Sequence, residues 1–152
     1  MKTKIKVILV SVVVTVLAFL TNTVGPLGTF WRPAPEAPIP NNMQTVLLAF
    51  LLFIEASAFG LGAAFLFFGY PLVQGLSSAS RSFNRVTHLS VTWLLMNWWA
   101  HDSLHIHTGM SDLNKLLVID YVFHFTIIAS TVILVAFLIV NLRNRKGAAA
   151  AV

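Results

Sequence analysis

The chain has 152 residues, of which 57% are hydrophobic and only 10% are charged, and its mean hydropathy is +0.82. A soluble domain usually carries about 25% charged residues, so this composition excludes an ordinary soluble domain, a disordered tail and a coiled coil. The formal net charge is +5, but the basic residues cluster beside apolar runs, which argues against nucleic-acid binding. The sequence therefore predicts a single all-α integral membrane domain over residues 1–152.

Four apolar segments predict four membrane-spanning helices, because a bilayer core needs about 20 apolar residues per helix. Their expected bounds are about 7–24, 43–70, 86–105 and 113–142. The first segment follows a lysine-rich start that is also typical of a signal peptide, but no A-x-A-like site follows it, so we expect a retained helix. Residues 25–42 contain five prolines and predict an extended extracytoplasmic loop.

Small residues form a stripe on the second segment. Ala56, Gly60 and Ala64 follow one another at four-residue spacing, which places them on one helical face and favours close packing of another helix. Pro71 is expected to end this segment, and residues 74–85 are expected to form a polar loop. A short turn at residues 108–112 joins the third segment to the fourth, and residues 147–152 form a low-complexity tail.

The basic residues predict the topology. Eight of the ten cluster at the N-terminus, in the loop between the second and third segments, and at the C-terminus. Loops rich in Lys and Arg stay on the cytoplasmic side of a membrane. We therefore expect an up-down-up-down four-transmembrane-helix bundle in the plasma membrane, with both termini cytoplasmic and the histidine-rich turn extracytoplasmic.

Polar residues gather near that turn on both flanking segments. Asn97, His101 and His105 recur every four residues and share one helical face, and Asp120 and His124 are also four residues apart. Because the two helices are antiparallel, equal distances from the turn place His101 opposite Asp120 or Tyr121, and Asn97 opposite His124. Ionisable groups inside a bilayer are costly and usually face the interior of a bundle, so these side chains are expected to meet.

Glu55 is a carboxylate inside the second apolar segment. At about 1.5 Å per residue, its depth below the outer end of its helix is within about one turn of the depth of His124. We therefore expect Glu55 to join the cluster from a third helix. An alternative is a protonated carboxyl that only hydrogen-bonds across helices.

This cluster predicts a transition-metal site in the outer half of the bundle. The sequence has no cysteine, so a metal must be held by nitrogen and oxygen ligands or by methionine. The imidazole and carboxylate groups of the cluster suit Fe, Cu or Zn. Side chains that orient the imidazoles would complete the site. The predicted metal ligands are His101, His105, Asp120, His124 and Glu55, and the predicted orienting residues are Asn97, Asp102 and Tyr121.

The function that this pattern favours is a small polytopic membrane metalloprotein, with metal-dependent oxidoreductase activity as one option. Two alternatives stay open. Two facing histidines are also typical of a b-type haem protein that transfers electrons. The small size also fits a non-catalytic accessory subunit of a larger membrane complex, in which the polar cluster contacts another chain. The expected partners are the lipid bilayer, other membrane subunits or a second copy of the chain, and not nucleic acid.

Overall fold

The computed structural model describes residues 2–22, 25–28, 42–77, 79–109 and 111–150, and it is all-α in this part of the chain. The predicted loop at 25–42 and the predicted tail at 147–152 lie partly outside the described residues. Five helices follow in chain order: α1 (Lys2–Thr21), α2 (Asn42–Phe68), α3 (Tyr70–Leu76), α4 (Arg81–Thr108) and α5 (Leu113–Ala150).

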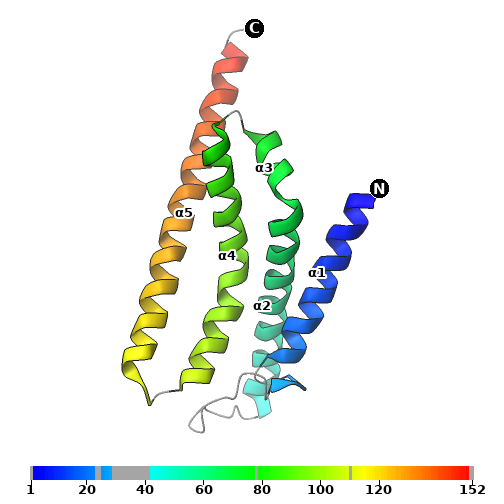
Figure 1. The fold of residues 1–152 in the computed structure, drawn as a ribbon, viewed down its shortest axis with the longest axis vertical. Coiled ribbons are helices and arrows are strands. Elements are labelled where there is room, and N and C mark those ends of the chain that lie inside the picture. Colours follow the sequence, from blue (N-terminus) through cyan, green and yellow to red (C-terminus); the bar gives the residue numbers. More distant parts are fainter. Residues whose placement is uncertain (1, 23–24, 29–41, 78, 110, 151–152) are drawn as a thin grey trace.

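The four long helices alternate in direction, so that the starts of α1 and α4 lie at the same end of the molecule as the end of α5 (Figure 1). They form a row in the order α1, α2, α4, α5, in which each helix packs on the next. Among the described residues, α5 packs extensively only against α4. The alternating directions agree with the prediction, but the row is open, and α4 is flanked by neighbours on both sides.

The structure corrects the prediction for residues around Pro71. Pro71 does not end the helical structure, because a short helix, α3, begins at Tyr70 directly after the break at Gly69. Proline is tolerated in the first turn of a helix, where its missing N–H would have no partner. The helix α4 also begins earlier than predicted, because the hydroxyl of Ser80 accepts a hydrogen bond from the backbone N–H of Phe83 and caps its first turn.

Three described helices are long and apolar enough to cross a membrane, over Thr3–Thr21, Thr45–Phe68 and Leu113–Asn144. They suggest an integral membrane location, and their exposed apolar side chains suggest contact with a lipid bilayer. The predicted count of four spanning helices is not confirmed, because α4 lacks the required hydropathy although it has 28 residues. Its low hydropathy has a clear origin, since it buries seven polar residues: Asn84, Thr87, His88, Ser90, Thr92, Asn97 and Ser103.

Two tryptophan side chains of α4 form hydrogen bonds to neighbouring helices of the row. The indole N–H of Trp93 donates to the hydroxyl of Thr126 at 3.0 Å and so joins α4 to α5. The indole N–H of Trp99 donates to the carbonyl of Ala18 at 3.1 Å and joins α4 to α1, while its ring lies 4.6 Å from the ring of Phe59 on α2. These bonds hold α4 in register with its neighbours.

The stripe of small residues on α2 packs against α1, as its spacing predicted. Ala56 and Ala64 are buried, and Gly60 lies where an added Cβ would collide with the backbone of Ser11 and the side chain of Thr15. Close backbone approach of this kind is how small residues join membrane helices. Gly60 therefore sets the distance between α1 and α2.

Substituting Gly60→Ala should destabilise the packing of α1 on α2, because the new methyl group meets backbone atoms that cannot move aside. The expected cost is about 1–3 kcal/mol, which is typical of overpacking. Thermal unfolding of the detergent-purified protein measures it. Gly75→Ala is the matched control, since nothing lies within 4 Å of a Cβ at that position. Equal melting temperatures for the two variants would contradict this account.

Candidate metal centre

The turn between α4 and α5 is fixed at both ends. Gly109 has a positive φ of 64°, which glycine adopts without strain, and its N–H donates to the carbonyl of His105 at 2.9 Å. The Asp112 carboxylate accepts the backbone N–H of Lys115 at 3.1 Å and pairs with its ammonium at 2.9 Å. The hydrogen bond from the Lys115 ammonium holds the pKa of Asp112 below its usual value. This turn sets the register of α5 against α4.

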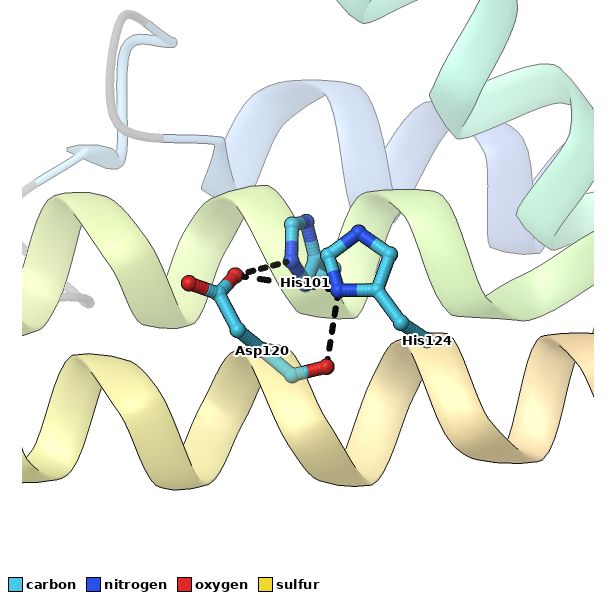
Figure 2. Close-up of side chains that lie close together, drawn as sticks. All are labelled: His101, Asp120 and His124. Atoms are coloured by element: carbon cyan, nitrogen blue, oxygen red, sulfur yellow. Dashed lines mark hydrogen bonds and ion pairs between the residues drawn. The ribbon is translucent and has the colours of Figure 1, made fainter.

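The register brings the polar residues of the two helices together (Figure 2). Asp120 Oδ1 lies 3.1 Å from His105 Nε2 and 3.5 Å from His101 Nε2, and the two imidazole Nε2 atoms are 3.1 Å apart. Figure 2 shows His101 reaching from α4 towards Asp120 and His124 on α5. His101, Asp120 and His124 each offer one ligand atom within 4.8 Å of the others, so this group could hold a metal ion.

Asp102 determines which nitrogen of His101 faces the cluster. The carboxylate of Asp102 lies 3.0 Å from His101 Nδ1. An ionised carboxylate only accepts hydrogen bonds, so His101 Nδ1 must carry the proton. In the neutral imidazole, Nε2 then presents a lone pair towards His105 and Asp120. A carboxylate that orients an imidazole in this way is common behind metal-binding histidines.

The centre of the cluster has more acceptors than donors. His101 Nε2 and Asp120 Oδ1 both present lone pairs when His101 is neutral, and they face each other at 3.5 Å. His105 Nε2 lies 3.1 Å from each of these two acceptor atoms, and its N–H is the proton donor that can bond to either of them. Two converging acceptors that share a single donor are suited to a bound cation.

The spacing of these three atoms fits a small ion. Atoms separated by 3.1, 3.1 and 3.5 Å lie about 1.9 Å from the centre of the circle through them, just under the length of about 2.0–2.1 Å typical of a Zn–N or Zn–O bond. The three atoms could therefore hold one cation together if His105 carried its proton on Nδ1, because an imidazole nitrogen binds a metal only through its lone pair. The side chains would not have to separate to admit it.

His124 is the second residue that α5 contributes to the cluster. Its Nδ1 lies 2.7 Å from the carbonyl oxygen of Asp120 and 3.9 Å from Asp120 Oδ1 (Figure 2). Its ring centroid is 5.4 Å from that of His101. The side chain is 57% exposed, compared with 13% for His101. His124 therefore forms the open edge of the cluster, whereas His101 forms its buried side.

Aromatic side chains surround His101. The rings of Phe123 and Trp98 lie 5.2 and 6.3 Å from its imidazole. The Trp98 ring meets the imidazole edge-on, a contact that the sequence did not predict. These rings exclude water from one side of the cluster, which strengthens electrostatic interactions within it.

The structure places the other predicted residues around the cluster rather than in its centre. Glu55 lies beside Asp102, which in turn contacts His101, and the buried Oε2 of Glu55 has no hydrogen-bond partner among the described residues. The Asn97 amide N–H₂ donates to the carbonyls of Trp93 and Leu94, and its buried Oδ1 is also unpartnered. Tyr121 is exposed on α5.

Comparison with known proteins adds no assignment to this geometry. No protein-family model, curated protein or solved structure matches the chain. The interpretation of the cluster therefore depends on its own distances, burial and chemistry.

The tautomer of His101 is a testable consequence of this arrangement. In the metal-free protein, nitrogen-15 NMR should show His101 in its Nδ1–H form, and Asp102→Ala should release it into a mixture of tautomers. Asp112→Asn is the control. It changes another aspartate but keeps a side-chain oxygen that can cap the helix, so the His101 signals should stay unchanged. An Nε2–H form of His101 in the unmodified protein would contradict the role given to Asp102.

Proposed function

We propose that this protein is a small integral membrane metalloprotein that binds one transition-metal ion between α4 and α5. The ligands are His101, His105, Asp120 and His124. The observation that carries this proposal is the triangle of His101 Nε2, His105 Nε2 and Asp120 Oδ1, whose edges of 3.1–3.5 Å match the spacing of ligand atoms around such an ion.

The donor set selects the class of metal. Three imidazole nitrogens and one carboxylate oxygen suit Zn²⁺, Cu²⁺ or Fe²⁺. Ca²⁺ and Mg²⁺ prefer shells made of oxygen atoms, so a site dominated by imidazole disfavours them. A thiolate site is excluded, since the chain has no cysteine.

A second layer of residues supports the ligands in this proposal. Asp102 fixes the tautomer of His101 through its 3.0 Å contact with Nδ1. Glu55 lies behind Asp102 and fixes it in turn from α2. Asn97 and Tyr121 lie on the two ligand helices without a described bond to a histidine; Asn97 is buried beside the site, whereas Tyr121 is exposed.

The open edge of the site favours a reactive centre over a closed structural one. Asp120 and His124 are 39% and 57% exposed, so a water molecule or substrate can reach the ion from the α5 side. A shallow groove beside His124 is lined mainly by apolar side chains of α5. A bound metal supplies Lewis-acid or redox chemistry at this position, which is the basis for proposing metal-dependent oxidoreductase activity on apolar molecules that enter from the lipid.

The same proposal assigns a topology. The start of α1, the start of α4 and the end of α5 carry clusters of Lys and Arg, and these three helix ends lie at the end of the row opposite the metal site (Figure 1). By the positive-inside rule, that end is cytoplasmic and the site lies in the extracytoplasmic half. We also propose that α4 crosses the bilayer as a fourth span, because its polar residues are buried rather than facing lipid.

Metal analysis of the protein purified in detergent and loaded with Zn²⁺ tests the proposal. We expect about one ion per chain, and we expect His101→Ala or Asp120→Asn to lower the occupancy at least tenfold, because each removes a ligand from the triangle. His107→Ala is the matched control, as an exposed histidine on the same helix outside the group.

Three results would overturn the proposal. Zinc occupancy that stays near zero would leave the cluster as a hydrogen-bonded network and favour the accessory-subunit alternative. A Soret band in the absorption spectrum would favour the b-type haem alternative instead. Equal occupancy in His101→Ala and His107→Ala would show that the ion binds elsewhere.

A further inference from the structure

A second feature of the fold lies at the opposite end of the row from the metal site. A cleft of about 340 Å³ opens between the first half of α1 and the break between α2 and α3. Its volume is in the lower range of small-ligand pockets. Its lining is almost wholly apolar and includes Val7 and Ser11 of α1, Phe65 and Leu72 beside the break, and Leu95 of α4.

The helix break holds this cleft open. The carbonyl of Phe65 accepts the Gly69 N–H at 2.7 Å and lies 2.8 Å from Nε2 of His88. The Phe65 ring also packs against the imidazole of His88, with 5.2 Å between centroids. His88 is buried on α4. Its contacts with Phe65 hold the end of α2, which forms one wall of the cleft, against α4. The cleft is therefore a preformed cavity rather than a gap between mobile side chains.

A lysine lies directly above the cleft on the same face of α1. Lys4 precedes Val7 by three residues and Ser11 by seven, and these spacings place all three side chains on one helical face. Lys4 is exposed and lies at the end of an apolar span, where a lysine side chain extends towards the membrane surface. Lys6 is also exposed, but it lies about 200° around the helix from Lys4.

We propose that this cleft binds an acyl chain of an anionic membrane lipid whose phosphate pairs with Lys4. The apolar lining matches a hydrocarbon chain, and the lysine at its mouth supplies the charge that distinguishes an anionic from a zwitterionic headgroup. The Oγ of Ser11 is the one polar side-chain atom among the described lining residues and is buried without a partner. This inference depends on the membrane location of the chain and not on its metal site.

Native mass spectrometry of the full chain in detergent tests this site with two probes, phosphatidylglycerol and phosphatidylcholine with identical acyl chains. The protein should bind phosphatidylglycerol more tightly. Lys4→Gln should reduce that preference about fivefold, the effect expected from one basic residue at a membrane surface. Lys6→Gln is the matched control and should change the preference much less, because it faces away from the cleft.

Filling the cleft gives an independent readout. Ser11→Leu replaces an unpartnered buried hydroxyl with an apolar group whose larger side chain occupies the space of the acyl chain, and thermal unfolding of the variant checks that it still folds. It should weaken the binding of both lipids about equally. Equal effects of Lys4→Gln and Lys6→Gln would overturn the proposal by showing diffuse attraction, and unchanged binding in Ser11→Leu would overturn it by showing that lipid does not enter the cleft.

Discussion

The register between α4 and α5 is the constraint on which the candidate site depends. A turn of only a few residues joins the two helices, and it is held by the positive φ of Gly109 and by the cap that Asp112 provides for α5. Because an α-helix rotates about 100° per residue, inserting or deleting one residue here would turn Asp120 away from His101. The turn therefore determines whether the histidines of α4 contact the carboxylate of Asp120 or an apolar surface.

The position of α4 in the row explains how a polar cluster can exist in so apolar a chain. Polar groups in a membrane need partners from the protein, since lipid offers none. The helix α4 has neighbours on both sides and buries its amide, hydroxyl and imidazole groups against them. The outer helices α1 and α5 instead expose mostly apolar side chains. The low hydropathy of α4 thus follows from its central position.

Much of this arrangement could be predicted from the sequence, because helical periodicity and a short turn fix which side chains face each other. The meeting of His101 with Asp120 follows from their equal distances from the turn, and the contact of Gly60 with α1 follows from the spacing of small residues. The position of Glu55 beside Asp102 could not be predicted, because it depends on the shift between helices that are not joined by a tight turn. The start of a new helix at Tyr70 was missed for a local reason, since a proline such as Pro71 is typical of a helix end but also suits the first turn of a new helix.

The central claim is that imidazole and carboxylate groups of α4 and α5 bind one metal ion together. X-ray absorption spectroscopy of the zinc-loaded protein measures the ligand shell of the ion most directly. The account predicts about four nitrogen and oxygen neighbours at roughly 2.0–2.1 Å, with the outer-shell scattering of two or three imidazoles. A shell of oxygen atoms without imidazole scattering would contradict it.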